Sequence, residues 1–422
     1  MLLEFKVNNF RVFKDKNVFS MYKNQNNALN DTLIEVKRNR EHFSLLPVKV
    51  IYGTNASGKS SILLAIDLLK KILLNKTLIS NDKDSIYQNS LIYHFIHDDK
   101  KYNEPISFYI SFLNNAKYEY ELKISKDDNL AAKVAYEKLT YNNVVIFKRI
   151  DNIVAYNPSR NKEFNKYIAL DDAYIKMSET LLKDNLNDTS VFTQWFNLSK
   201  EIMDDFNEYV YKKLFIYFNM NQIKILPGIL REDDSTKIVN DVLFRMVKEA
   251  EFGPQEIYFS RSDKNSNEVE LRAKYNTPEN FEVTLPSYLT ESDGTIDLVY
   301  FLFPFMNAII TGGVLFFDEL DASLHPEVMA AIIKCFENPS VNKKGAQLIF
   351  TTHNPVYLNK NLFRKDEIVF VEKDKKDYSS TIFTLADVEA RSDGSYLKKY
   401  LEGKYIEFAN IDFSEIMKDI MK

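Results

Sequence analysis

Gly53-Thr-Asn-Ala-Ser-Gly-Lys-Ser60 is the stretch that decides the fold. It matches the pattern G-x-x-x-x-G-K-[ST] at every fixed position, and its flanks are those that the pattern requires. The apolar run Val48–Tyr52 before it predicts a buried strand, and Ser60–Leu74 after it predicts a helix because apolar residues recur there at helical spacing. A glycine-containing loop between a strand and a helix predicts an α/β domain that binds phosphate; a chance loop is the weaker alternative.

The residue types of this phosphate loop, Gly53–Ser60, fit a nucleotide with bound Mg²⁺. Its glycines let the backbone curl so that successive N–H groups point toward phosphate oxygens, and the start of the helix adds partial positive charge. We expect Lys59 to reach the β- and γ-phosphates of ATP and the Ser60 hydroxyl to bind Mg²⁺. The residues predicted to contact the nucleotide here are Gly53, Asn55, Ser57, Gly58, Lys59, Ser60 and Ser61.

Val314-Leu-Phe-Phe-Asp-Glu319 is an apolar strand that ends in two carboxylates. Two acids at a strand end are costly unless a cation is nearby. We therefore expect Asp318 to bind Mg²⁺, directly or through water. We expect Glu319 to act as the general base that orients or deprotonates the attacking water. A capped strand with exposed acids is the alternative interpretation.

Gln347-Leu-Ile-Phe-Thr-Thr-His353 predicts a third strand that ends in a histidine. A lone histidine at a strand end is more often structural, but its place after the acid pair fits a sensor of the γ-phosphate. His325, in Asp321-Ala-Ser-Leu-His-Pro326, fits a turn and a contact between subunits better than catalysis.

Thr290-Glu-Ser-Asp-Gly-Thr295 precedes a predicted helix over Ile296–Ile310. A simple helix N-cap is one interpretation of this stretch. Its position before the acidic strand favours another, in which Ser292, Gly294 and Thr295 bind the γ-phosphate that another subunit holds.

The order of these patterns predicts a divided nucleotide-binding head. Lys59 and Asp318 are about 260 residues apart, too far for a compact core. Short alternating runs between Ile106 and Phe147 predict an antiparallel meander. We expect the head to comprise residues 1–160 and 251–422, with a mainly helical lobe inserted at 161–250.

Composition limits the classes of protein to which this sequence can belong. The 422 residues are 45% apolar and 14% aromatic, which is typical of a globular protein, and the net charge of −5 is weak evidence against a protein that coats nucleic acid. The single Cys335 excludes an internal disulfide and fits a reducing cytoplasm as a packed thiol. The N-terminus does not resemble a signal peptide, and Leu298–Ile310 is too short to span a membrane, so we expect a soluble cytoplasmic protein.

The motifs in this order resemble the ABC-type ATPase heads of the SMC/RecF/OLD group. The opening Asn8-Asn-Phe-Arg-Val-Phe-Lys14 is similar to that group's N-F-R-x-F start, which implies that Arg11 approaches the nucleotide. The resemblance implies that Gly53–Ser60 is the Walker A motif, Ser292–Thr295 the signature, Asp318-Glu319 Walker B and His353 the switch histidine. The C-terminal motifs resemble more narrowly the stand-alone AAA family ATPases of the RloA and abortive-infection type.

The chain also departs from the wider group. Asp293 and Thr295 stand where the signature usually has Gly and Gln. No clear Q-loop glutamine stands out, since Gln88 lies in roughly the right interval but fits an exposed loop residue equally well. The insertion lacks sustained heptads, which excludes a long SMC coiled coil, and too few residues follow His353 for a Toprim nuclease domain. Glu372, Asp374 and Asp377 fit a solvated charge run at a strand end.

The resemblance implies an ATP-driven switch, a homodimer closed around ATP or a higher oligomer. It also implies control of a separate nuclease-like effector in bacterial defence against phage. A DNA-binding repair ATPase of the RecF type is a rival hypothesis, so nucleic acid stays a possible partner. A scaffold locked by ATP with negligible hydrolysis is a third, although Glu319 argues against it.

Overall fold

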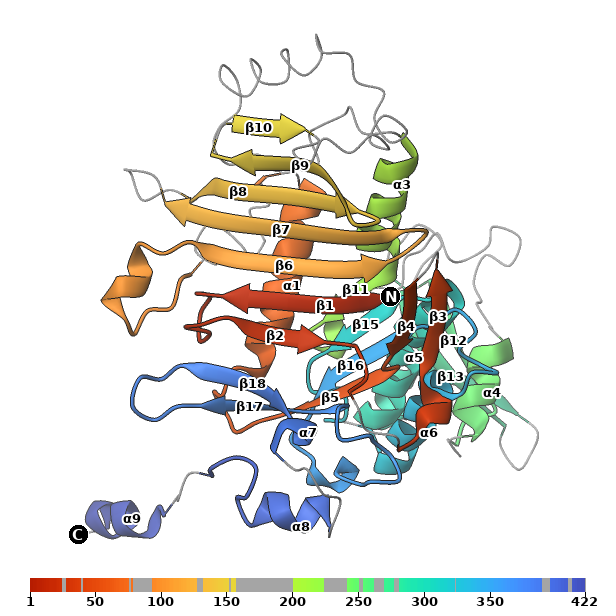
Figure 1. The fold of residues 1–422 in the computed structure, drawn as a ribbon. Helices are drawn as coiled ribbons and strands as arrows, with labels where there is room; N and C mark the ends of the chain where they lie inside the picture. The colour runs from red at the N-terminus through yellow and green to blue at the C-terminus, as the bar shows by residue number, and fades with distance from the viewer. Residues whose placement is uncertain are drawn as a thin grey trace.

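The computed structural model describes residues 1–24, 28–38, 41–75, 77–78, 93–126, 132–151, 153–156, 200–223, 241–249, 253–261, 269–276, 281–322, 324–388, 395–408 and 412–421. Figure 1 shows how the helices and strands of these residues are arranged.

A six-stranded, mostly parallel sheet lies at the centre. Its strand order is β11-β15-β16-β5-β17-β18, and only β18 runs antiparallel to its neighbour. The strands are β5 (Val48–Tyr52), β11 (Leu214–Tyr217), β15 (Val314–Phe317), β16 (Gln347–Thr351), β17 (Ile368–Lys373) and β18 (Ser380–Thr384).

Both faces of this sheet are buried, which explains its uninterrupted apolar runs. Along β15, Val314 and Phe316 join one hydrophobic cluster, whereas Leu315 and Phe317 join another on the opposite face. The sheet therefore separates two cores, and the three strands predicted beside the motifs are confirmed.

A seven-stranded antiparallel sheet forms a second layer, with the order β10-β9-β8-β7-β6-β1-β2. The meander predicted between Ile106 and Phe147 is confirmed as four of its strands. Helix α1 (Lys59–Asn75) passes behind this sheet in Figure 1 and shares a hydrophobic cluster with both sheets. The strands are β1 (Leu2–Asn8), β2 (Asn17–Ser20), β6 (Ile106–Leu113), β7 (Lys117–Lys126), β8 (Ala132–Tyr141), β9 (Val144–Ile150) and β10 (Ile153–Tyr156).

The other face of the central sheet packs on α5 (Asp293–Thr311), α6 (Pro326–Glu337) and a three-stranded sheet. That sheet contains β12 (Glu256–Arg261), β13 (Val269–Asn276) and β14 (Glu282–Pro286), and β3 (Ile34–Arg38) pairs with β4 (Glu41–Leu45) elsewhere. The other helices are α3 (Lys200–Glu208), α4 (Asp241–Glu249), α7 (Leu385–Val388), α8 (Tyr396–Leu401) and α9 (Ser414–Ile420). Short helical turns occupy Asn30–Thr32, Asp99–Tyr102, Tyr209–Lys213, Met220–Gln222, Ser287–Leu289 and Pro355–Tyr357.

Helix α5 is longer than the predicted Ile296–Ile310, because Ser292 caps it and Gly312 ends it in a left-handed conformation. By length and composition its 19 residues would suffice to cross a membrane. In this fold Leu298, Phe301 and other apolar residues of the helix pack into the core instead.

The domain boundaries stay a prediction, because most of 161–250 lies outside the described residues. Within that range, β11 is the edge strand beside β15 in the central sheet. The predicted lobe 161–250 therefore includes residues of the head's central sheet, which the local sequence did not indicate. Cys335 is half-buried on α6 and packs against the core, as expected of a packed thiol.

Candidate functional site

The strand order brings three predicted motifs to one edge of the central sheet. β15, β16 and β5 are consecutive parallel neighbours, so their carboxyl ends lie side by side. The phosphate loop follows β5, the acid pair Asp318-Glu319 follows β15, and His353 follows β16. Ligands of open α/β sheets bind beyond the carboxyl ends of the strands, so this edge is the candidate nucleotide site.

The phosphate loop adopts a backbone that its small residues permit. Gly58 has a φ of +109° and Ala56 a φ of 60°, both in the positive range that side chains disfavour. A Cβ on Gly53 would lie 2.4 Å from Ser57 Oγ and 2.6 Å from the Val371 carbonyl oxygen. The tight curl around the helix start therefore depends on both glycines.

Lys59 folds back over the loop. Its Nζ donates to the carbonyl oxygens of Gly53, at 2.9 Å, and of Thr54, at 3.2 Å. Burial lowers the pKa of Lys59, and the nearby charges of Asp318 and Glu319 oppose that shift. The ammonium group is thus within electrostatic reach of both acids, as predicted for a lysine at a phosphate site.

The rest of the loop is arranged around this lysine. Ser57 and Ser61 are buried, Ser60 is half-buried, and Asn55 is exposed at the tip. Within the described part of the chain, the buried Ser57 hydroxyl has no hydrogen-bond partner. An orphaned polar atom inside a loop of this shape is consistent with a polar ligand.

Thr351, at the end of β16, joins the two acids. Its Oγ1 donates to Asp318 Oδ1 at 2.5 Å and accepts the backbone N–H of Glu319 at 2.7 Å. Glu319 has a φ of 50°, so the chain turns sharply after the strand. Sequence reasoning assigned no role to Thr351, and only the pairing of β15 with β16 reveals it.

Glu319 and His353 meet at the solvent-facing side of the site. Glu319 Oε1 lies 3.4 Å from His353 Nε2, and their side chains are 56% and 43% exposed. Next to them Thr352 Oγ1 donates to Asp321 Oδ2 at 2.7 Å, and burial raises the pKa of Asp321. The base and sensor predicted from sequence are therefore neighbours, open to an incoming ligand.

The predicted signature residues lie elsewhere, at the start of α5. Ser292 Oγ accepts the Thr295 N–H at 3.2 Å, so Ser292 is the N-cap that one interpretation proposed. Ser292, Gly294 and Thr295 line a groove of about 820 Å³ together with residues of α4, α5 and α6. In the described part of the chain, no hydrogen bond or ion pair links them to the phosphate loop. His325 caps α6 on the rim of the same groove.

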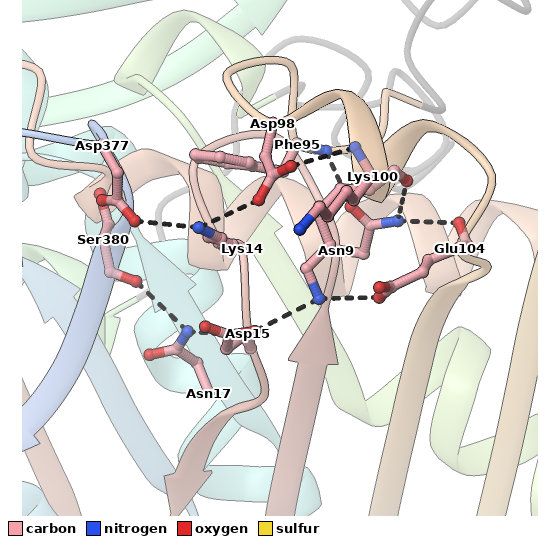
Figure 2. Close-up of polar contacts among 11 residues, drawn as sticks. Asn9, Lys14, Asp15, Asn17, Phe95, Asp98, Lys100, Glu104, Asp377 and Ser380 are labelled. Carbon is pink, nitrogen blue, oxygen red and sulfur yellow. Dashed lines mark hydrogen bonds and ion pairs between the residues drawn. The ribbon is translucent and has the colours of Figure 1, made fainter.

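The loop Asn9–Asp15 follows β1 of the antiparallel sheet, and Figure 2 shows its Lys14 between Asp98 and Asp377. Arg11 has a φ of 53° and donates its backbone N–H to Tyr93 O at 2.9 Å. The next residue, Val12, lies against Gly58, where an added Cβ would approach Val12 Cγ2 to 2.6 Å. The predicted contact between Arg11 and a nucleotide remains a prediction, although its loop adjoins the site.

Of the two weaker sequence candidates, the structure places the acid run after β17 but not Gln88. Asp374 accepts N–H groups in the turn after β17, and Asp377 forms an ion pair with Lys14 at 3.2 Å, so these acids stabilise a turn. Gln88 lies outside the described residues.

The donor set fits ATP with Mg²⁺. The loop offers to phosphate oxygens its backbone N–H groups, the buried ammonium of Lys59 and the Ser57 hydroxyl, which has no partner among the described residues. Ser60 and Asp318 supply oxygen ligands of the kind that Mg²⁺ takes together with phosphates and water.

The strand order, the phosphate loop, the acid pair and the histidine define an ABC-type P-loop ATPase head. The chain belongs to the family described as "AAA domain, putative AbiEii toxin, Type IV TA system", whose model matches residues 48–359. That range includes the phosphate loop, the predicted signature, the acid pair and His353, and it excludes Arg11. The predicted resemblance to abortive-infection ATPases is confirmed.

One curated relative is the "Retron Vc95 probable ATPase" of Vibrio cholerae serotype O1 biovar El Tor, 25% identical over 354 residues. The match covers 73% of this chain and 66% of the relative, so the chain spans just under two thirds of that protein.

Among solved structures, an SMC head domain from Thermotoga maritima is 13% identical with a TM-score of 0.40, covering 91% of this chain and 98% of that one. The Smc head domain with an extended coiled coil bound to the C-terminal domain of ScpA, from Pyrococcus furiosus, is 14% identical with a TM-score of 0.36, covering 100% and 99%. At these TM-scores the likeness is loose, and the fold assignment depends on the strand order and the site.

Proposed function

We propose that this ATPase head hydrolyses ATP in sites shared between two copies of the chain. The observation that supports this is the separation of the motifs. The phosphate loop, Asp318, Glu319 and His353 meet at one edge, whereas Ser292, Gly294 and Thr295 lie on another surface. A γ-phosphate held at that edge would need a second copy to bring a signature to it.

In this proposal each side chain has a defined task. Lys59 leaves the Gly53 and Thr54 carbonyl oxygens and binds phosphate oxygens, which are better partners for a cation. Asp318, oriented by Thr351, would hold Mg²⁺ together with Ser60, and a bound Mg²⁺ would supply positive charge that offsets the charge of the phosphates. Glu319 takes the proton of the attacking water, and His353 donates a hydrogen bond to the γ-phosphate.

The same proposed contacts would link ATP binding to the interface between two copies of the chain. The N-terminus of α5 carries partial positive charge, and the Ser292 hydroxyl and the Gly294 N–H offer neutral donors to an anion. Because the γ-phosphate joins two surfaces, nucleotide state becomes interface state. Two copies placed head to tail close around two ATP molecules.

Complementation between two inactive variants tests the shared site. Lys59→Ala disables the phosphate loop, and Ser292→Asp keeps a good N-cap but adds a charge that repels phosphate. A mixed dimer has one site that carries both changes and one that carries neither. An equimolar mixture should therefore regain about a quarter of the wild-type ATPase rate, since half of the dimers are mixed and each has one intact site.

Ser292→Asn is the matched control, because it caps the helix without adding charge, and it should lose less activity than Ser292→Asp. A mixture as inactive as its components, when both variants still form dimers, would rule out the shared site. Full ATPase activity in Lys59→Ala alone would overturn the assignment of the phosphate loop itself.

We further propose that the head acts in the bacterial cytoplasm as a switch for a separate effector in phage defence. The family description names a toxin system, and the relative named above is a retron ATPase. The test is co-expression with the product of the neighbouring gene, followed by phage challenge. Wild type should protect and Lys59→Ala should not, and equal protection by both would refute ATP control of the effector.

A further inference from the structure

Ser380, the first residue of β18, touches the phosphate loop from outside the nucleotide site. Its hydroxyl donates to the Ser57 carbonyl oxygen at 2.6 Å, and its backbone N–H donates to the Val12 carbonyl oxygen at 2.7 Å. The residue is 2% exposed, and a Cβ on Gly58 would meet Ser380 Oγ at 3.4 Å. One buried serine thus holds two loops that are distant in sequence.

The bond to Ser57 fixes the orientation of one peptide plane. In a planar trans peptide the C=O and the following N–H point in opposite directions. When Ser380 holds the Ser57 carbonyl toward β18, the Gly58 N–H of the same peptide points away from β18. Gly58 has few conformational restraints of its own because it lacks a side chain. An external hydrogen bond therefore supplies the restraint that the glycine cannot.

Ser380 can act as an anchor because its surroundings are fixed (Figure 2). Asn17 Nδ2 donates to the Ser380 carbonyl oxygen at 3.3 Å, and Asn17 Oδ1 accepts the Ile382 N–H at 2.8 Å. Lys14 bridges Asp98, at 3.1 Å, and Asp377, at 3.2 Å. Strand β18 is thereby joined to β2 of the antiparallel sheet, and the turn before β18 is joined to the loop Asn9–Asp15.

We propose that Ser380 is a positioning residue of the nucleotide site, which presets the Gly58 N–H for a phosphate oxygen. This inference depends on the proposed ATP site at Gly53–Ser60. A preset donor spares the loop the entropy of ordering when ATP binds, so the contribution of Ser380 is to nucleotide affinity. Glu319 and His353 are untouched by it, so the rate of the bound complex changes less than the affinity.

The test compares Ser380→Ala with wild type in three measurements: the melting temperature without nucleotide, the Kd for Mg–ATP by calorimetry, and kcat against KM. Loss of one hydrogen bond to the loop should weaken ATP binding about five- to tenfold. We expect KM to rise with it, while kcat falls less than twofold. Ser380→Thr retains the hydroxyl and should recover most of the affinity.

Thr381→Ala is the matched control, because Thr381 is the exposed neighbour on the same strand, and its Kd should equal that of wild type. A lower melting temperature with an unchanged Kd would show that Ser380 is merely structural and would overturn the inference. If wild type itself did not bind Mg–ATP, or Lys59→Ala bound it equally well, the proposed function would fail instead. The two failures are therefore distinguishable.

Discussion

Replacing Thr351 by valine removes one hydroxyl from the site and nearly preserves the shape of the side chain. The hydroxyl makes two hydrogen bonds, to Asp318 Oδ1 at 2.5 Å and from the Glu319 N–H at 2.7 Å. Thr351 itself is fully buried, whereas Asp318 is half-buried and Glu319 exposed. Water can therefore replace part of what is lost, and the free energy of unfolding should fall by about 1–2 kcal/mol.

The effect on catalysis should be larger than the effect on stability. Without Thr351 the Asp318 carboxylate loses the donor that would orient it toward the proposed Mg²⁺ site, and such partners of metal ligands are worth about 10–100-fold in affinity or activity. We expect Thr351→Val to lower the ATPase rate within that range and to require a higher Mg²⁺ concentration for half-maximal activity. A Mg²⁺ titration of the steady-state rate, with urea unfolding alongside, measures both effects.

Thr351→Ser is the control, because it keeps the hydroxyl and removes only a methyl group. It should retain the wild-type Mg²⁺ dependence even if it is slightly less stable. Wild-type activity and Mg²⁺ dependence in Thr351→Val would refute the reasoning, since the hydroxyl would then have no part in orienting Asp318.

Two further predictions concern the loop and the core. Gly58→Ala should abolish nucleotide binding measured by calorimetry, because the φ of +109° and the 2.6 Å approach to Val12 Cγ2 leave no place for a Cβ. Gly253 has open space around it, so Gly253→Ala is the control and should bind nucleotide as wild type does. Burial raises the pKa of Glu337 from 4.5 to about 7, so the folded state retains a proton that the unfolded state releases, and stability is lost as pH rises through that window. Glu337→Gln should therefore stabilise the protein by about 1–2 kcal/mol at pH 8 and not at pH 4, and equal unfolding midpoints of the two proteins at pH 8 would contradict this.

Local sequence patterns were sufficient to predict the strands, loop and helix that form the candidate site. The phosphate loop, its strand and its helix follow from glycine spacing and apolar periodicity within a short stretch, and β5 spans the predicted residues Val48–Tyr52. The meander was predictable because alternation along each strand reports one buried face. Helix α5 began earlier than predicted, since its first turn is polar and only the Ser292 cap marks it.

Sequence could not reveal the contacts between distant segments. β11 belongs to the central sheet although its neighbours along the chain are helical, because its position is decided by pairing with β15. Ser380 and Thr351 are common residue types whose roles depend on a partner strand. No local pattern distinguishes them from other buried hydroxyls.

By itself the sequence predicted which residues would bind phosphate, which acids would accompany them and that the head is divided, because these predictions depend on short-range spacing and residue chemistry. The tertiary structure decided which of them meet. It placed Gly53–Ser60, Asp318 and His353 on one edge through the order β15-β16-β5, and it left Ser292 on another surface. It also placed Ser380 against Ser57, residues 323 positions apart, since only folding brings such segments within hydrogen-bond distance.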